Sequence, residues 1–224
     1  MSIYTRFVKK IADHRQPDSL AAKYRKQRFT LFQTLTEQLD GPLTILDVGG
    51  TERFWNRMLP STSPLYKVIL LNKFSQPITR PDFTSLVGDA RAMQQFADKE
   101  FDIVFSNSVI EHVGSFEDQR KMADEIRRVG KRYFVQTPNR YFPIEPHFLF
   151  PFFQFFPIWM KCWLIQHFDL GWRKRTPDYQ SAMEIAKEIR LLSKREFVNL
   201  FPEGRLVEEH FLGFVKSFTI YYGW

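Results

Sequence analysis

Residues 43–51 read Leu-Thr-Ile-Leu-Asp-Val-Gly-Gly-Thr and decide the fold. A short apolar run that ends in an acid and a glycine pair is typical of a strand buried on both faces of a parallel sheet. The glycines permit a sharp turn and let a ligand lie against bare backbone. Thr51 is a good N-cap for a helix that runs to Leu59. Strand, glycine turn and capped helix together predict a nucleotide-type crevice, with the helix N-terminus facing a negative group.

Further apolar runs alternate with helical patterns along the rest of the chain. We expect parallel strands at residues 67–72, 84–87, 101–105 and 131–137. We expect helices at residues 19–39, 90–96, from Ser115 to Gly130, at 178–192 and from Ser193 to 201. Residues 205–211 and 214–222 read as a closing antiparallel hairpin. The pattern predicts an α/β, Rossmann-like, doubly wound and mostly parallel sheet with helices on both faces.

Polar residues follow three of the predicted strands. Asn72 ends the second strand, where a doubly wound fold places the group that reaches a nucleotide ribose. Asp89 follows the third strand and is also a good N-cap for residues 90–96. Asn107 follows the fourth. Because the carboxyl ends of parallel strands meet at one edge of a sheet, we expect these residues to share one crevice, although Asn72 could simply begin a loop.

The order of residues in the first turn narrows the ligand. A dinucleotide fingerprint needs Gly-x-Gly-x-x-Gly, whereas Asp47 here precedes only Gly49 and Gly50. Together with Phe-Asp-Ile-Val-Phe-Ser-Asn at residues 101–107 and Ile-Glu-His-Val at 110–113, the turn resembles class I S-adenosylmethionine-dependent methyltransferases of the small-molecule, type 11-like kind. Thr51 and Arg53 replace later glycines of the family motif, and Asn72 replaces its usual acid.

That resemblance covers residues 43–140 and implies S-adenosylmethionine as the cofactor. The cofactor contacts that it implies are Asp47, Gly49, Gly50, Asn72, Asp89 and Asn107. The expected activity is methyl transfer to a small-molecule, lipid-linked or glycan-related acceptor. Methyltransferases that flip a base carry Asn/Asp-Pro-Pro-aromatic after the fourth strand, and this chain does not, so no nucleic-acid partner is expected.

Two other functions compete with this enzyme. The chain could keep the fold without catalysis and serve as a membrane-associated or partner-binding module, which its departures from the glycine motif favour. A nicotinamide-dependent oxidoreductase is the third interpretation, and the missing Gly-x-Gly-x-x-Gly speaks against it.

Four polar residues are candidates for proton transfer, which an acceptor that loses a proton would need. They are Glu111, His112, Glu145 and His147. We favour His147 as the catalytic residue because two nearby prolines stiffen its surroundings, with His112 second; either could instead only tie down a loop. No metal site is expected, because these residues do not form a His-x-x-x-His spacing on one helix.

Residues 141–180 are unusually aromatic. A membrane-spanning helix needs about 20 mainly apolar residues, and Pro151, Pro157 and Lys161 interrupt residues 148–168. Two interpretations stay open. The segment could be a lid that closes an apolar pocket, which we favour, or residues 148–168 could make peripheral contact with a membrane, helped by the basic residues 173–175.

The chain of 224 residues is predicted to form a single domain with a net charge of +7, which favours anionic partners. Its parts are a helical region at 1–40, the cofactor-binding core at 43–140, the lid at 141–180, and helices and closing strands at 181–224.

The one cysteine, Cys162, excludes an internal disulfide. Residues 1–13 lack an apolar core, so no signal peptide and a cytoplasmic location are expected. The basic cluster of Lys23, Arg25, Lys26 and Arg28 is interpreted as a solvated helix face.

Overall fold

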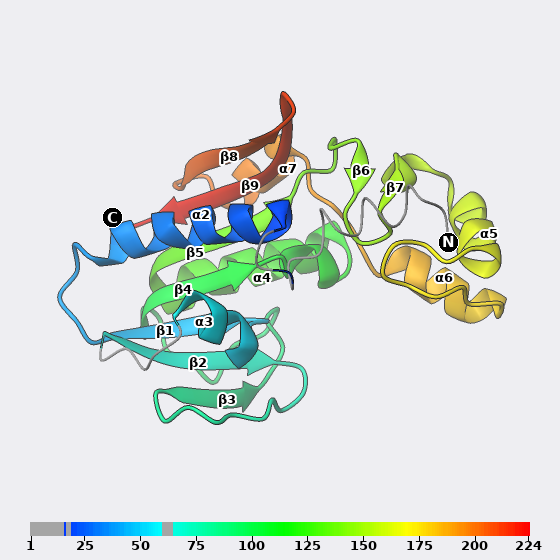
Figure 1. Ribbon diagram of the computed structural model, residues 1–224. Helices are drawn as coiled ribbons and strands as arrows, with labels where there is room; N and C mark the ends of the chain where they lie inside the picture. Colours follow the sequence, from blue (N-terminus) through cyan, green and yellow to red (C-terminus); the bar gives the residue numbers. More distant parts are fainter. Residues whose placement is uncertain (1–15, 17–18, 60–64) are drawn as a thin grey trace.

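The computed structural model describes residues 16, 19–59 and 65–224, and its centre is a seven-stranded sheet (Figure 1). The strand order is β3-β2-β1-β4-β5-β9-β8. The bounds are β1 Leu43–Val48, β2 Tyr66–Asn72, β3 Phe83–Val87, β4 Phe101–Asn107, β5 Gly130–Pro138, β8 Arg205–Phe211 and β9 Phe214–Tyr222. The first five strands are parallel, whereas β9 runs antiparallel to β5 and β8. The predicted sheet and its closing hairpin are confirmed.

Helices cover both faces of the sheet, as predicted. On one face, α2 (Leu20–Thr36) and α3 (Glu52–Met58) bury Phe32 and Trp55 against Ile45 of β1. On the other face, α4 (Phe116–Val129) and α7 (Lys194–Leu200) bury apolar side chains around the next residue of β1, Leu46. Successive residues of β1 therefore enter opposite cores, which is why the strand is apolar throughout.

The helix starts follow the predicted capping residues. Ser19 and Thr51 accept hydrogen bonds from backbone N–H groups in the first turns of α2 and α3. Ser115 and Ser193 open α4 and α7 with reciprocal capping boxes. Residues 1–13, on which the expectation of no signal peptide rests, lie outside the described residues.

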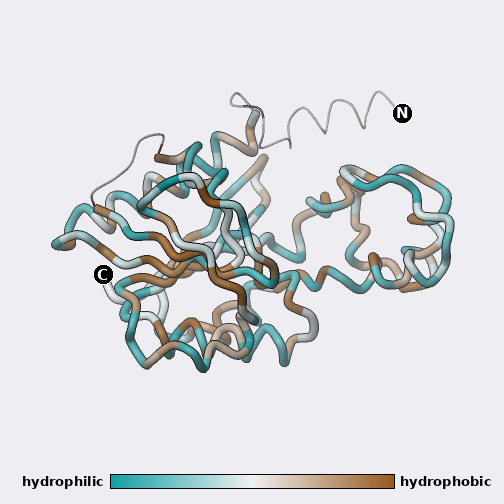
Figure 2. Tube along the Cα trace, turned by 90° about the horizontal axis from the view of Figure 1, so that it is seen from below, coloured by the Kyte–Doolittle hydropathy of each residue, from teal (hydrophilic) through white to brown (hydrophobic). Residues whose placement is uncertain are grey.

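The lid, defined from here on as residues 141–187, projects from one end of the sheet (Figures 1 and 2). It contains β6 Ile144–Glu145, β7 Phe150–Pro151, the short helix η2 Phe153–Phe155, α5 Ile158–His167 and α6 Tyr179–Lys187. It has a small core of its own, in which Phe148, Phe153 and Cys162 pack with α6. In the described residues, no helix combines the length and the apolar character that crossing a membrane requires.

Two predicted helices differ from the structure. Residues 90–96 form turns rather than a helix, because the Asp89 carboxylate accepts the backbone N–H of Arg91 and so holds a tight turn. The helix predicted at 178–192 ends at Lys187. Beyond Lys187 the chain crosses back to the core. There the backbone N–H of Arg190 donates to the Glu111 carbonyl at 2.9 Å, and Leu192 forms an isolated parallel β-bridge with Asn139.

Candidate functional site

The point where the strand order reverses lies between β1 and β4, which are neighbours in the sheet. In doubly wound folds ligands bind outside the carboxyl ends of the strands at this switch point. Gly49 and Gly50 follow β1 here, and Asn107 ends β4. On the other side of β1, Asn72 ends β2, and its carbonyl accepts the Gly88 N–H at 2.9 Å. That bond brings the loop carrying Asp89 to the same edge.

The glycine turn leaves no room for side chains. Gly49 has φ +77°, and a Cβ there would lie 2.6 Å from the Val109 methyl groups. A Cβ on Gly50 would lie 1.7 Å from Oδ2 of Asp47. Both contacts are far below van der Waals distance, so this turn requires glycine at both positions.

Asp47 lies behind the turn and is buried. Its Oδ2 accepts a hydrogen bond from the Trp55 indole N–H at 2.7 Å. Burial raises the pKa of the Asp47 carboxyl to about 7, against the opposing effect of that bond. The bond ties β1 to α3 and so fixes the shape of the turn between them. Direct contact of Asp47 with a cofactor stays a prediction.

The other predicted cofactor residues present polar atoms along the edge. The Asn72 amide donates to the Gly50 carbonyl at 2.9 Å, which leaves its Oδ1 as an acceptor. Hydrogen bonds from Arg91 lower the pKa of Asp89 to about 2 and keep it ionised. Asn107 accepts from the Arg28 guanidinium at 2.5 Å. A glycine turn flanked by hydrogen-bonding side chains fits a nucleoside ligand with ribose hydroxyls and an exocyclic amine.

Arg28, which donates to the predicted cofactor residue Asn107, is a neighbour of the candidate site that the sequence analysis misses. Its interpretation as part of a solvated face is wrong, because its side chain is 9% exposed and its Nε lies 2.5 Å from Oε1 of Glu209 on β8. Lys23 and Lys26 are exposed as expected. The sequence does indicate that Arg28 differs from its exposed neighbours. Arg28 lies in the same i, i+4, i+7 row as the apolar residues Tyr24 and Leu31.

A second polar cluster joins the core to the lid. His112 lies in the short helix η1 Ile110–His112 after β4, and His147 follows β6. Their ring centroids are 4.8 Å apart with the planes at 89°. Nδ1 of His147 lies 2.7 Å from Oε1 of Glu145. The other oxygen of Glu145 accepts the backbone N–H groups of His147 and Phe148. The structure thus brings the candidate residue His112 of the core together with the candidates Glu145 and His147 of the lid.

The protonation of this cluster follows from its surroundings. Burial works to lower the pKa of His147, but the hydrogen bond and charge of Glu145, with the charge of Glu111, raise it overall. Burial raises the pKa of Glu111 to about 6, and the charge of His147 opposes the rise. Burial and the charge of His147 lower the pKa of His112 to about 4, so its ring stays neutral at physiological pH.

Glu111 is the member of the cluster with unused hydrogen-bonding capacity. Its Oε2 accepts from the Thr137 hydroxyl at 3.1 Å, whereas the buried Oε1 has no hydrogen-bond partner among the described residues. Ligand atoms of Glu111, His112 and His147 all lie within 4.8 Å of one another. These three residues could hold a metal ion if they moved slightly closer, since zinc takes imidazole and carboxylate ligands at about 2.1 Å. The prediction of no metal site rests on the missing His-x-x-x-His spacing on one helix. That argument does not decide the question, because the three residues come together from different segments.

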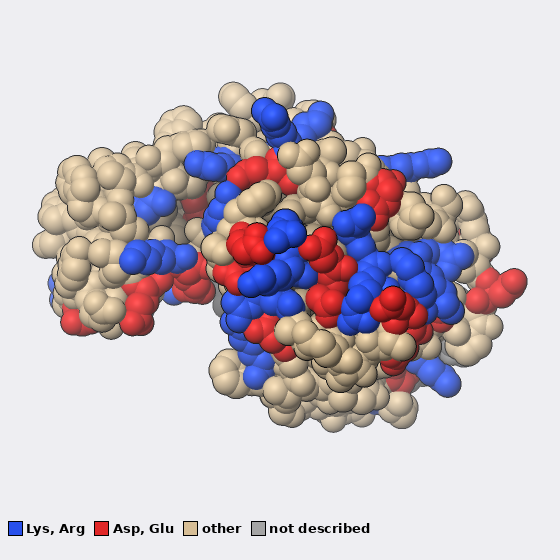
Figure 3. Space-filling view, turned by 180° about the vertical axis from the view of Figure 1, so that it is seen from behind, with Lys and Arg blue, Asp and Glu red and all other residues tan. Residues whose placement is uncertain are grey.

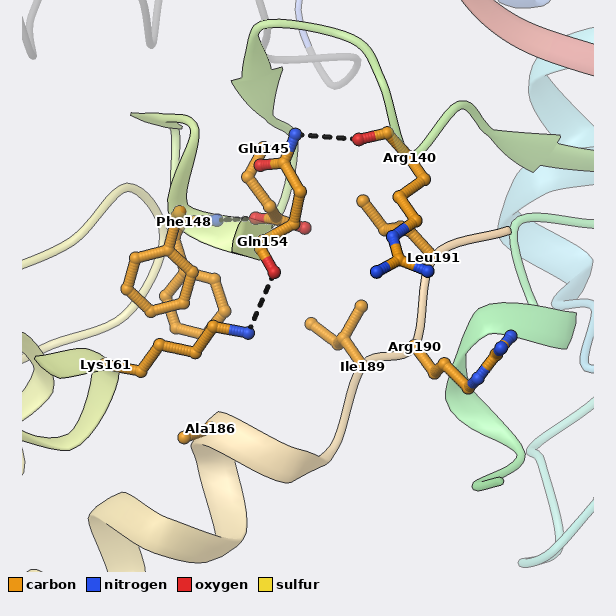
Figure 4. Close-up of a pocket in the computed structure, with 10 residues that line it drawn as sticks. Arg140, Glu145, Phe148, Gln154, Lys161, Ala186, Ile189, Arg190 and Leu191 are labelled. Carbon is orange, nitrogen blue, oxygen red and sulfur yellow. Dashed lines mark hydrogen bonds between the residues drawn. The ribbon is translucent and has the colours of Figure 1, made fainter. Parts of the chain in front are cut away.

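A cavity of about 350 Å³ lies between the lid and the core, beside the cluster (Figure 4). Glu145 and Phe148 belong to its wall, and the Arg140 guanidinium points into it. The remaining lining residues are Phe153, Gln154, Lys161, Ala186, Ile189, Arg190 and Leu191. Half of these lining residues are charged or carry an amide, so the cavity is more polar than the apolar pocket that the lid interpretation predicts. A concave site with polar groups that converge on one space is still suited to a small molecule.

A family model described as a methyltransferase domain matches residues 62–133. The match runs from before β2, through β3, β4 and α4, into β5. The chain has the class I methyltransferase fold. The expected resemblance is confirmed at this level, and S-adenosylmethionine is the cofactor that the fold and the family model imply.

Solved structures share this methyltransferase fold at low sequence identity. The CurJ carbon methyltransferase superimposes with a TM-score of 0.57 and 15% identity, covering 91% of this chain and 55% of CurJ. A protein from Anabaena variabilis, assigned as a methyltransferase of an antibiotic biosynthesis pathway, gives a TM-score of 0.50 and 14% identity, covering 81% of this chain and 64% of its own.

Among curated relatives, uncharacterized proteins from two strains of Mycobacterium tuberculosis are 31% identical to this chain over 81 residues. The aligned part is 36% of this chain and 27% of each relative. The chain therefore spans about a quarter of the curated relatives and about half of CurJ.

Proposed function

We propose that this chain transfers a methyl group from S-adenosylmethionine to a small-molecule acceptor, lipid-linked and glycan-related molecules included, held between the core and the lid. The observation that carries the proposal is the Glu145–His147 pair, which stands with Glu111 and His112 beside the end of β4. A histidine whose ring is oriented by a buried carboxylate is an arrangement suited to taking a proton from a reacting group.

The cofactor supplies an electrophilic methyl group when bound. For its binding we assign Asn72, Asp89 and Asn107 as hydrogen-bonding side chains, with the Gly49–Gly50 turn as the bare backbone beneath it. The Asp47–Trp55 hydrogen bond keeps that turn in shape. The protein's main contribution is alignment, since an acceptor held close and in line reacts without further activation of the methyl group.

The base in this proposal is Nε2 of His147. With its Nδ1–H donated to Glu145, the ring keeps a lone pair on Nε2 that can take the proton of a hydroxyl, a thiol or a carbon acid. Glu145 then stabilises the imidazolium that forms. The neutral His112 ring packs edge-on against His147 and limits its rotation. Glu111 Oε1 is available to a donor group of the acceptor.

The first test is isothermal titration with S-adenosylmethionine and S-adenosylhomocysteine. We expect micromolar binding, about −8 kcal/mol, that Asp89→Ala and Asn107→Ala each weaken. Asp98→Ala is the matched control, because Asp98 is also an aspartate paired with an arginine, Arg128, but its side chain is 76% exposed and away from the site. Binding that all three variants leave unchanged would place the cofactor elsewhere.

The same assay separates this enzyme from its two competitors. A non-catalytic relative predicts no heat with either ligand at millimolar concentration, and an oxidoreductase predicts tighter binding of a nicotinamide dinucleotide. If the S-adenosyl ligands bind, radiolabelled methyl transfer onto a panel of hydroxyl, thiol and carbon-acid acceptors, compared with His147→Asn, then tests the proposed base.

A further inference from the structure

The cavity between the lid and the core contains two cations without acidic partners. Arg140 comes from the loop after β5, and Lys161 comes from α5 of the lid. Among the described residues, neither has a carboxylate within ion-pair distance. The Lys161 ammonium donates to the Gln154 carbonyl at 3.2 Å and lies 5.8 Å from the centre of the Phe153 ring. In Figure 4 both charged ends approach the same space from opposite sides.

The remaining charges of the cavity wall are already engaged. The Glu145 carboxylate is used by His147 and by two backbone N–H groups. Arg190 turns its guanidinium away from the cavity, toward Glu196 and Gln119. Burial lowers the pKa of Lys161, the charge of Glu145 works against this, and the charge of Arg140 adds to it. Unpaired positive charge in a partly buried cavity is costly unless a ligand brings a negative group.

The other surfaces of the cavity are apolar or able to accept a hydrogen bond. Phe148, Phe153, Ile189 and Leu191 form the apolar part. Oε1 of Gln154 is buried and accepts no hydrogen bond from the described residues. A ligand that fits this wall has an apolar body, an anionic group and a hydroxyl or amine that donates.

We infer that the cavity is the acceptor site and that Arg140 and Lys161 bind an anionic oxygen group of the acceptor, either a phosphate or a carboxylate. This inference rests on the proposed function, and it adds that the acceptor is an anion. The anionic group anchors the acceptor while its methyl-accepting atom lies toward His147, since Glu145 belongs both to the cavity wall and to the histidine pair. The lid contributes Lys161, so lid and core bind the anion together.

The test uses three probes of similar shape: phenyl phosphate, benzoate and the neutral benzyl alcohol. We expect one or both anions to bind in titration calorimetry at concentrations where benzyl alcohol does not. Arg140→Gln and Lys161→Met should each weaken that binding about tenfold, since each removes one charge-assisted hydrogen bond. Lys161→Met keeps the length of the side chain that packs on Phe153, which protects folding. Preference between the two anions identifies the group.

The control is Lys174→Met, because Lys174 is an exposed lysine of the lid that does not line the cavity. Equal binding of an anion by wild type and both cavity variants would overturn the inference, and so would stronger binding of the alcohol. Circular dichroism establishes that each variant folds. S-adenosylhomocysteine binding is measured on the same samples, so loss of the anion site is distinguished from failure of the cofactor site.

A second inference comes from the outer face of the lid. The α5 side chains Cys162, Leu164 and Ile165 are buried within the lid. The opposite side carries Trp159, 65% exposed, and Trp163, 49% exposed, one helical turn apart. Phe152, Phe155 and Phe168 extend the exposed aromatic surface at both ends of α5. We call these five residues the aromatic face.

The charges around the aromatic face suit an anionic surface. Residues 146–168 contain no Asp or Glu, and exposed Lys174 and Arg175 follow shortly after. The acid next to this stretch, Asp169, accepts the backbone N–H of Arg175 at 2.9 Å. Figure 3 shows the outer and upper part of the projecting end as uncharged, with acidic and basic side chains along its lower part and a densely charged core beside it. Exposed tryptophan and phenylalanine on one side of a helix, with cations nearby, are typical of segments that lie in a membrane interface.

We propose that the aromatic face docks on the surface of a bilayer that contains anionic lipid. The test is sedimentation with vesicles of phosphatidylcholine alone and with phosphatidylglycerol added. Wild type should bind the anionic vesicles with a blue shift of tryptophan emission, and the double variant Trp159→Ser, Trp163→Ser should lose most of the binding. Phe74→Ser is the control, because Phe74 is 78% exposed on the core side of the molecule after β2.

Two results would overturn membrane docking. One is an absence of vesicle binding by wild type, and the other is binding that the tryptophan pair does not affect. Light scattering after size exclusion distinguishes the alternative occupant, since a second copy of the chain on this face would give a dimer that the double variant converts to monomer.

Discussion

Oε1 of Glu145 lies 2.7 Å from Nδ1 of His147, and the same carboxylate accepts the backbone N–H groups of His147 and Phe148. One buried side chain therefore fixes both the ring and the backbone that carries it. In the proposed mechanism the lid is therefore part of the reactive centre, because Glu145 and His147 belong to the lid while Glu111 and His112 follow β4 of the core.

Glu145→Gln should lower the rate of methyl transfer and shift its pH dependence. Glu145 and Glu111 raise the pKa of His147, so the wild-type rate should rise as the pH increases through a value above that of an ordinary histidine. Replacing the charge by an amide removes much of this rise in pKa, so the limb of the profile moves to lower pH. The maximal rate should fall about a hundredfold, because glutamine stabilises the imidazolium poorly.

The pH profile of kcat checks this prediction, and S-adenosylhomocysteine affinity serves as the control. A structural role for Glu145 would lower the rate without moving the pH limb. A limb that stays in place in Glu145→Gln would therefore contradict the role of His147 as the base.

Zinc should inhibit the enzyme. Ligand atoms of Glu111, His112 and His147 lie within 4.8 Å of one another, and zinc bound there would occupy the nitrogen that the mechanism needs. We expect inhibition by micromolar zinc, reversal by EDTA, and reduced sensitivity in His112→Gln. EDTA alone should leave the wild-type rate unchanged. If dialysis against EDTA abolishes activity and zinc restores it, the three residues form a metal centre instead of a proton-transfer site.

The strands and helix caps are predictable from the sequence because their causes are local. A strand buried on both faces is apolar along its whole length, as β1 and β4 are, and Ser115 and Ser193 satisfy backbone N–H groups within one turn of the chain. The hairpin of β8 and β9 is likewise located by its Leu212-Gly213 turn, in which both residues have positive φ.

The errors have tertiary causes. Residues 90–96 have helical composition, but their backbone is held by side chains of α4. The Met93 N–H donates to Glu125 and the Met93 carbonyl accepts from Arg128, and a helix would use these backbone groups for its own hydrogen bonds. Arg28 is counted with its exposed neighbours because its partners, Asn107 and Glu209, lie far along the chain. The contact between His112 and His147 could not be predicted from the sequence for the same reason. It forms because the folded lid returns His147 to η1.

The Arg28–Glu209 pair should stabilise the fold and the site together. Both side chains are about nine-tenths buried, and Arg28→Met would leave Glu209 with the Ser217 hydroxyl and, 3.8 Å away, the Lys216 ammonium as its partners. We expect a loss of about 3 kcal/mol in the free energy of unfolding and weaker cofactor binding, because Asn107 loses its donor. Denaturant unfolding of Arg28→Met, Glu209→Gln and the double variant measures the coupling energy of the pair.

The exposed pair Arg120–Glu117 provides the comparison for that cycle, with both side chains more than half exposed. Its coupling should be much smaller, because solvent screens an exposed ion pair. A coupling at Arg28–Glu209 no larger than this would mean that the buried pair is structurally dispensable.

Asp47→Asn should stabilise the protein above neutral pH. The pKa of Asp47 in the folded protein, about 7, lies well above that of an ordinary aspartate, so Asp47 contributes most to stability at low pH and loses that contribution as the pH rises through about 7. Asparagine keeps an acceptor for the Trp55 indole without the buried charge. The gain is at most about 4 kcal/mol above neutral pH and vanishes toward about pH 4. Urea unfolding at about pH 5 and about pH 8 measures it.

The exposed residue Asp98 gives the control for that experiment, since Asp98→Asn should show no such dependence on pH. A variant of Asp47 that is less stable than wild type at both pH values would mean that the carboxylate is required in its ionised form.

Gly50→Ala should disrupt the cofactor turn. The new Cβ would lie 1.7 Å from Oδ2 of Asp47, whose hydrogen bond to Trp55 prevents it from moving away cheaply. We expect a loss of about 3 kcal/mol in stability and loss of S-adenosylhomocysteine binding. Gly213→Ala is the matched control, because its φ of +81° strains alanine by about 1 kcal/mol although nothing lies within 4 Å of the new methyl group. If both variants bind the ligand normally, close packing behind the turn is not what shapes the site.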